Sequence, residues 1–476
     1  MHGAMFRLSR ILAVLSSLAA CAAGVRAQVQ PGQVAPPLEV AWTGTPVAIG
    51  TAGPVVVVAF HRSLAAAACD GDVLRDLDRR GGEHGVLMIV VLAERLPANQ
   101  APAQQLPVAL AVDTDGRARA RWLGEQADGY VVLAEHDRIA WTGQPGQGLR
   151  AAVALAAAGE YDFAASAERL RQRQQLEDLF TDVGSAAARE LAQRVVTAWP
   201  TDGPSWAIRW LGDELRRDDA AAAATAAAAL AALADDPRAL AAFADLALRA
   251  ATQPRVLAGS LLAPLAVAAA NCPDDLCIQL ARLRALVHSG NGREVGRTAQ
   301  QLARKVEGVG AAAVEFVEIL THDAEPEVHK DLGARALRVP RPGDVDARTL
   351  AAVRYAQALR CERNAIAARE VACDYLDRLP GRAVVNNEAW ELMTALPSCG
   401  RFDAFALALA ERMLEQRAAL EPFELDTAAL AMFRNGRGDE AIELQAAAVE
   451  RSGGDATYKD RLEHYRAALA GKPAPR

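Results

Sequence analysis

The 476-residue sequence lacks the spacings that identify metal and hydrolytic sites. It contains no CxxC pair, no quartet of cysteines and histidines and no HExxH motif. Structural zinc and metalloprotease sites depend on such spacings, so we expect neither a metal nor a cofactor. Eight histidines are scattered along the chain, and no Ser-His-Asp arrangement has a supporting motif.

Dense runs of lysine and arginine are also absent, and the net charge is −7. Nucleic acids bind through clustered positive charge, so we do not expect them as partners. Charged residues are 23% and hydrophobic residues 51%, which is typical of a soluble globular protein. After the N-terminal residues no segment has 18 unbroken apolar residues of membrane type, so we expect no membrane-spanning helix. The length predicts two or more domains.

Residues 1–27 have the pattern of an export signal. Arg7 and Arg10 give a positive start, and the apolar run 11–20 is too short to cross a bilayer as a helix. The pattern predicts export to the periplasm or cell envelope, and the alternative is the apolar N-terminal helix of a cytosolic protein.

Two processing sites compete at the end of this segment. The sequence VRA before Gln28 has the small-x-small form of ordinary cleavage. The sequence LAAC (18–21) has the form of a bacterial lipobox, which would leave Cys21 as a lipidated N-terminus. A lipid at Cys21 is the only membrane contact that we expect.

Strand and helix signals alternate from residue 38 to 160. The β-branched runs indicate strands buried on both faces. The expected strands are 54–60, 86–93 and 107–113, followed by a hairpin over 129–143 that turns at His136-Asp137. The expected helices are one beginning at Asp72 and ended by the glycines after Arg80, one over 115–124 and one over 148–162. This order predicts a mixed α/β sheet.

From residue 163 onward the strand signals stop, and helical segments follow one another between short breaks. The breaks are WPTDGP, DDP, TQP, SGNGR, EGVG, VPRPGD, LPGR and RNGRGD. The alanine-rich stretch 218–236 favours helix because alanine loses no side-chain entropy there. Trp199, Trp206 and Trp210 surround the first break, where we expect them to pack in the core or between domains. The alternative is a pocket for a partner.

Two C-terminal stretches can be superimposed with a 35-residue offset, so that Ala406 and Ala441 take the same tight position. This part, about 385–470, resembles tetratricopeptide-type repeats. The resemblance implies a stacked array of helix pairs whose surface binds a partner protein.

Residues 31–162 resemble the thioredoxin-like superfamily, on the branch of exported thiol oxidoreductases and peroxiredoxin-type proteins. The resemblance rests on PGQVAPPLEV, GPVVVVAFHRS and GYVVLAEHDRIAWTGQPG. It implies an active-site turn after the first long strand. We therefore divide the chain into a signal (1–27), a thioredoxin-like α/β domain (28–162), an all-α repeat domain (163–470) and a tail (471–476).

The cysteine pair that this resemblance requires is missing. Aligned with the commonest form of the family, the two thiols would fall on Ala65 and Ala68. In the form that Arg62 supports, they would fall on Ala66 and Cys69, which leaves only the resolving thiol. A lone resolving thiol does not complete a disulfide-exchange cycle.

Two further departures point the same way. In the peroxiredoxin pattern, Cys69 would be the peroxide-reducing cysteine, but the family's proline and threonine fall on Arg62 and Ala66. The cis-proline that shapes the substrate groove of thioredoxins aligns with Asp128. The resemblance therefore implies a degenerate site and an interaction scaffold rather than an enzyme. The alternative is a thiol oxidoreductase or peroxidase working through Cys69.

Three interpretations of Cys69 stay open: a small buried residue, a single redox thiol, or one half of a disulfide with a cysteine of the helical part. The sequence NCPDDLC suggests a local disulfide between Cys272 and Cys277. In THDAEPEVHK (321–330), His322 and His329 match no ligand spacing, so we expect a solvated turn between helices.

Overall fold

The computed structural model covers the chain from residue 29 to 470 with internal gaps. It describes 29–470 except 44–45, 48, 50–54, 62–66, 68–69, 94–107, 125–127, 180–184, 252, 307–308, 325–331, 334–335, 338–346 and 395–400. The segments 1–27 and 471–476, with both processing sites and Cys21, lie outside the described residues.

The described residues form two compact units. One contains 29–319 together with 336–337, and the other contains the described part of 320–333 together with 347–470. The change from mixed to all-helical structure falls near residue 162, as expected, but the compact units divide within the helical part. The first unit therefore holds the sheet and twelve of the nineteen described α-helices.

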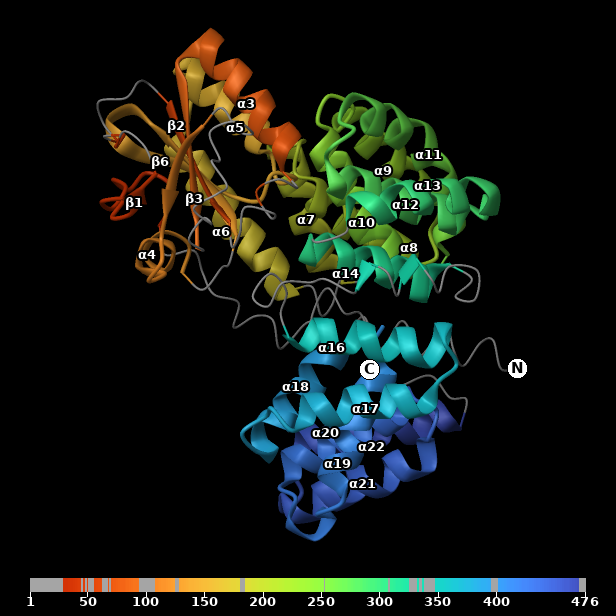
Figure 1. The fold of residues 1–476 in the computed structure, drawn as a ribbon. Coiled ribbons are helices and arrows are strands. Elements are labelled where there is room, and N and C mark those ends of the chain that lie inside the picture. The colour runs from red at the N-terminus through yellow and green to blue at the C-terminus, as the bar shows by residue number, and fades with distance from the viewer. Residues whose placement is uncertain are drawn as a thin grey trace. The chain divides into compact units, whose positions relative to one another are not determined.

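A mixed sheet of six strands forms the N-terminal part of the first unit (Figure 1). The strands are β1 (Ala41–Trp42), β2 (Val55–His61), β3 (Val86–Leu92), β4 (Ala109–Val112), β5 (Gly129–Ala134) and β6 (Arg138–Gly143). Their order is β1-β4-β3-β2-β5-β6, and β2, β3 and β4 run parallel. The other neighbours pair antiparallel. The expected α/β sheet and its closing hairpin are confirmed, with the turn at His136 (φ 56°) and Asp137 (φ 59°).

Helices cover both faces of this sheet, which explains the unbroken apolar strands. All seven residues of β2 are buried. Helices α3 (Gly71–His84) and α5 (Leu149–Ala158) pack on one face, and α4 (Arg117–Leu123) packs on the other. Because both faces need apolar side chains, the strands cannot alternate with polar residues.

The end of α3 differs from our prediction. We expected the glycines after Arg80 to end the helix, but it continues through Gly81 and Gly82 to His84. It ends before Gly85, whose φ of 73° is the left-handed conformation of a helix stop. An interior glycine costs only about 1 kcal/mol, and Leu74 and Leu77 already anchor the helix on the sheet.

The rest of the first unit is helical, and helices begin or end at each of the expected breaks in this part. The helix boundaries between residues 178 and 186, 215 and 219, and 271 and 276 fall outside those breaks. The helices are α6 (Phe163–Asp178), α7 (Ala186–Ala198), α8 (Gly203–Leu215), α9 (Asp219–Ala232), α10 (Pro237–Ala250), α11 (Pro254–Asn271), α12 (Leu276–Ser289), α13 (Gly292–Lys305) and α14 (Gly310–Glu318). Trp206 and Trp210 are buried in the core, as expected, whereas Trp199 is only half-buried.

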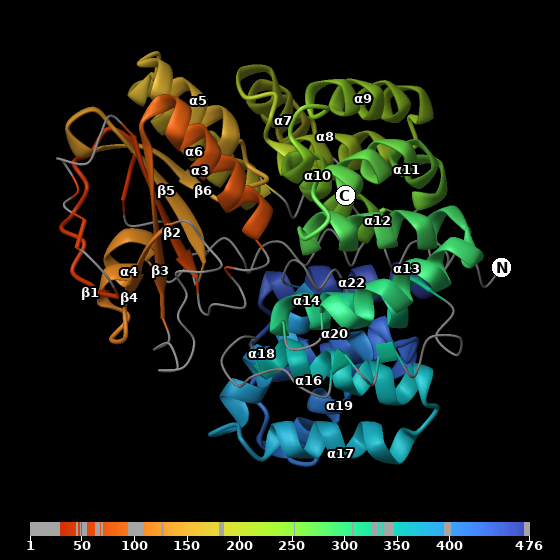
Figure 2. The same cartoon turned by 45° about the horizontal axis from the view of Figure 1, so that its top comes forward.

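These helices form an inner and an outer layer (Figure 2). Helix α10 packs on both α8 and α12, while α9 packs on α8 and α11 packs on α12. The inner helices lie close together: a Cβ on Gly203 of α8 would lie 2.0 Å from the backbone oxygen of Ala239 in α10. The outer helices keep one face in solvent, where Val256 of α11 is 83% exposed.

Helix α11 passes the length and composition test for a membrane span, which we did not expect from the sequence. Its Leu257, Leu261 and Leu265 are buried within the helical array, and one third of the helix is buried. The apolar residues of α11 thus serve to pack it, as an outer helix, on the rest of the array.

The second unit repeats the helix-pair pattern. Its helices are α16 (Ala347–Ala356), α17 (Ala365–Leu376), α18 (Arg382–Thr394), α19 (Asp403–Leu414), α20 (Pro422–Arg434), α21 (Gly438–Arg451) and α22 (Ala456–Leu469). Ala406 and Ala441 hold equivalent positions in α19 and α21, and both are fully buried. The predicted tight position of the repeat is confirmed.

Residues 321–323 are not the solvated turn that we expected. They belong to a π-helical turn (Ile319–Asp323), and Thr321 is fully buried. The ring of His322 packs edge-on against Phe402, and Asp323 forms an ion pair with Arg401. The burial of Thr321 and these two contacts, rather than solvation, fix this segment. His329 lies outside the described residues.

Candidate functional site

The site begins where the thioredoxin resemblance places the active-site turn, at the end of β2. Ala65, Ala66, Ala68 and Cys69 lie outside the described residues, while Ala67 and Asp70 lie within them. In the antiparallel pairing of β2 with β5, Phe60 lies opposite Gly129. Asp128, the residue before Gly129, therefore lies opposite the end of β2. The backbone oxygen of Asp128 accepts a hydrogen bond of 2.7 Å from Gln144.

A chain of buried polar side chains connects β2, β5 and the start of α3. The hydroxyl of Tyr130 on β5 donates a hydrogen bond of 2.8 Å to Asp70, the residue before α3. The same hydroxyl lies 3.4 Å from Nε2 of His61, the last residue of β2. His61 is 2% exposed and Tyr130 is 1% exposed, so bulk water does not satisfy these groups.

Arg238, the second residue of α10, joins this chain to the helical part of the same unit. Its guanidinium forms an ion pair with Asp70 and another, of 2.5 Å, with Asp275 before α12. The Arg238 side chain is only 12% exposed. One buried cation therefore ties the candidate turn to the start of α10, 168 residues later, and to the start of α12.

The pKa shifts follow from this burial. Burial alone would lower the pKa of Arg238, but Asp70 and the other negative groups outweigh it and hold the pKa well above its ordinary value. Burial lowers the pKa of His61 despite the opposing charge of Asp70, which favours a neutral imidazole. Burial, together with Asp70, raises the pKa of Tyr130 well above its ordinary value, so this hydroxyl keeps its proton.

Further contacts link the outer face of α3 to the same helical turns. Asp72 accepts a hydrogen bond of 3.1 Å from the backbone of Asp274, and Asp72 also pairs with Arg75 at 2.5 Å. Arg150 of α5 pairs with Asp76 at 3.3 Å and donates to the backbone oxygen of Asp235. Both sides of the junction thus contribute donors and acceptors.

Cys272 and Cys277 frame the same junction as free thiols. The local disulfide that we expected is not formed in this structure. Burial raises the pKa of Cys272, and the carboxylate of Asp72 raises it further. Burial raises the pKa of Cys277 well above its ordinary value, and Arg238 only partly opposes this. Both thiols therefore favour the protonated form, which is the less reactive one.

Three successive inner helices begin at this junction with a buried aspartate. Asp202, Asp236 and Asp275 precede α8, α10 and α12 and accept a backbone hydrogen bond from the first turn. Their exposed fractions are 0%, 6% and 0%. Buried carboxylates at helix N-termini compensate the helix dipoles.

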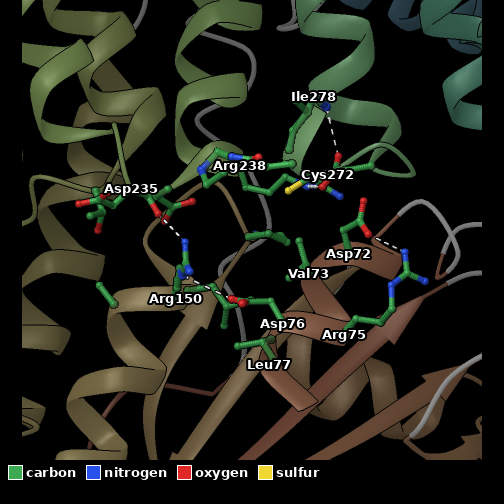
Figure 3. Close-up of a pocket in the computed structure, with 18 of the residues that line it drawn as sticks. Asp72, Val73, Arg75, Asp76, Leu77, Arg150, Asp235, Arg238, Cys272 and Ile278 are labelled. Atoms are coloured by element: carbon green, nitrogen blue, oxygen red, sulfur yellow. Dashed lines mark hydrogen bonds and ion pairs between the residues drawn. The ribbon is translucent and has the colours of Figure 1, made fainter. Parts of the chain in front are cut away.

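A cleft of about 1050 Å³ lies between α3 and α5 on one side and these helix starts on the other (Figure 3). Apolar side chains such as Val73, Leu77 and Ile278 contribute part of its lining. Five aspartates and four arginines also line it, which leaves one carboxylate in excess. Figure 3 shows Arg150 reaching across from α5 toward Asp235.

Within the described part of the chain, no group of three or more potential metal ligands comes together. Comparison with known proteins finds no matching family model, no similar curated protein and no similar solved structure.

Sequence reasoning missed the partners of the candidate turn. Asp70 stands beside Cys69 in the sequence, but no pattern there indicates Arg238, Tyr130 or Asp275 as its neighbours in the fold. The one local signal was the Asp-Asp-Pro break before Arg238, which predicts a helix start. It does not predict what that helix start contacts.

Proposed function

We propose that this chain is an exported cell-envelope protein that binds other proteins through its helical repeats. Its N-terminal sheet is a thioredoxin-like module that has lost redox turnover and serves as a structural part of the binding protein. Export rests on the signal-like residues 1–27 and the lipobox alternative at Cys21.

The sheet topology supports the thioredoxin-like assignment. Three parallel strands continue into an antiparallel closing hairpin, and a helix on one face follows the strand that ends at the candidate turn. The helix pairs of the second unit, with their equivalent buried alanines, support a repeat scaffold.

The buried ion pair between Arg238 and Asp70 carries the proposal of inactivity. A disulfide oxidoreductase needs its turn open to a protein substrate. Here the residue that follows Cys69 is bonded to the helical part of the same unit and to Tyr130. A turn that is used as an internal junction supports a structural role.

Insulin reduction and peroxide consumption by the full chain test this proposal. We expect the same background rate from the wild type, from Cys69→Ser and from the control Cys373→Ser, which changes an exposed free thiol. Turnover that disappears only in Cys69→Ser would show that the chain is an enzyme.

A second candidate function is thiol exchange within the chain, between Cys69 and Cys277 or Cys272. It is favoured by the position of both thiols at the junction that Asp70 and Asp72 help to build. Forming such a disulfide would pass two electrons and two protons to an external disulfide. Peptide mapping of the mature protein without reductant tests it, because a Cys69-linked peptide would establish the pairing.

A further inference from the structure

The three buried aspartates at the helix starts differ in their cationic partners. Asp275 pairs with Arg238 at 2.5 Å, and Asp202 pairs with Arg169 at 3.7 Å. Asp236, between them, has no ion pair among the described residues. Its Oδ1 accepts the hydrogen bond from Ala239, and its Oδ2 has no hydrogen-bond partner.

A buried carboxylate without an ion pair is costly. Leaving a charged acceptor without a partner costs more than leaving a neutral one, so such groups are normally paired. Burial raises the pKa of Asp236, since neighbouring Arg150 and the backbone amides only partly offset the loss of hydration. Arg150 is itself engaged with Asp76 and with the Asp235 backbone.

Asp236 lines the cleft described above, beside the exposed Asp235. The cleft carries one excess carboxylate, and Val73, Leu77 and Ile278 offer apolar contacts. A volume of about 1050 Å³ is at the upper end of ligand sites, so it has room for several peptide residues.

We propose that this cleft binds an extended polypeptide segment through one lysine or arginine side chain, which forms an ion pair with Asp236. The flanking residues of the segment lie on the apolar part of the cleft. The inference rests on the proposed function in one respect: in both, the protein binds another polypeptide.

Fluorescence polarisation with full-length protein tests the proposal, using the labelled peptide Ala-Val-Lys-Val-Ala and its norleucine analogue as probes. We expect the lysine peptide to bind and the norleucine peptide to bind at least about tenfold more weakly, because one charged contact is lost. Equal binding of both peptides, or no binding of either, would overturn the proposal. Tighter binding of spermidine than of the lysine peptide would overturn the assignment to a polypeptide.

Asp236→Asn is the decisive variant, because asparagine caps a helix as well as aspartate but carries no charge. We expect it to weaken the lysine peptide by about tenfold to a hundredfold and to melt at no lower temperature than the wild type. Asp218→Asn is the matched control, since Asp218 caps α9 in the same way and is exposed outside the cleft. Wild-type affinity in Asp236→Asn would overturn the proposal.

These outcomes are separable from those of the redox assay. Turnover through Cys69 would refute the proposed inactivity and leave the peptide titration unchanged. Absence of peptide binding together with absence of redox turnover would refute the proposed peptide site in the cleft. It would not contradict the proposed repeat scaffold.

Discussion

Helices α10 and α11 begin with the same two residues, proline and arginine, and use them in opposite ways. Pro237-Arg238 opens an inner helix, where the guanidinium bonds two carboxylates and is 12% exposed. Pro254-Arg255 opens an outer helix, where the arginine is exposed and the residue before the helix makes no capping bond. The Pro-Arg pair marks where each helix starts. The layer in which the helix lies decides whether its arginine is buried in ion pairs or exposed to solvent.

The largest expected effect comes from replacing these two arginines. Arg238→Met would leave Asp70 and Asp275 buried without their cation, so we expect a loss of about 3–5 kcal/mol in the free energy of unfolding. Arg255→Met should change it by less than about 0.5 kcal/mol, as at other exposed sites. Urea unfolding followed by circular dichroism measures both. Equal losses would remove the distinction between the layers.

Gly203 tests the close approach of the inner helices. In Gly203→Ala the new Cβ would meet the backbone oxygen of Ala239 at 2.0 Å, so α8 and α10 must move apart. We expect a loss of about 1–3 kcal/mol, as in other overpacked cores, measured by the same unfolding experiment. An unchanged stability would mean that the layer is loosely packed.

A charge cluster within the inner layer predicts a dependence on pH. Asp245 and Arg249 of α10, Arg284 of α12 and Glu315 of α14 form mutual ion pairs. Burial and the neighbouring Asp245 raise the pKa of Glu315 to about 7. The folded state thus binds this proton more tightly than the unfolded chain, and the resulting stability is full below about pH 4.5 and lost as the pH rises to 7.

The variant Glu315→Gln lacks this titration. We expect the wild type to lose about 3 kcal/mol relative to the variant between pH 4.5 and pH 7.5. Thermal unfolding over that range measures the difference, and groups common to both proteins, such as Asp403, cancel. Parallel curves for the two proteins would contradict the shifted pKa.

The smallest effect is expected on the outer layer. A Cβ on Gly259 of α11 would meet no atom within 4 Å, so Gly259→Ala adds helix propensity without a clash. We expect a gain of about 0.5–1 kcal/mol in the free energy of unfolding. A loss instead would indicate that this face of α11 is covered in solution.

Local patterns in the sequence predicted most of the fold, because strands and helix ends depend on neighbouring residues. The runs at 55–61 and 86–92 became buried strands, and the Asp-Pro and Gly breaks became helix boundaries. The candidate site was less predictable, since Asp70 and Arg238 are 168 residues apart and neither lies in a recognisable motif. The glycines of α3 misled us because packing on the sheet outweighs their local cost.

The separation between Asp70 and Arg238 has a consequence for biosynthesis. A chain growing at about 5–20 residues per second leaves Asp70, at the start of α3, without its arginine partner for roughly 10–30 s. During that interval Asp70 lacks the cation that it pairs with in the folded protein. The ion pair between Asp70 and Arg238 therefore forms only after α10, in the middle of the polypeptide, has been synthesised.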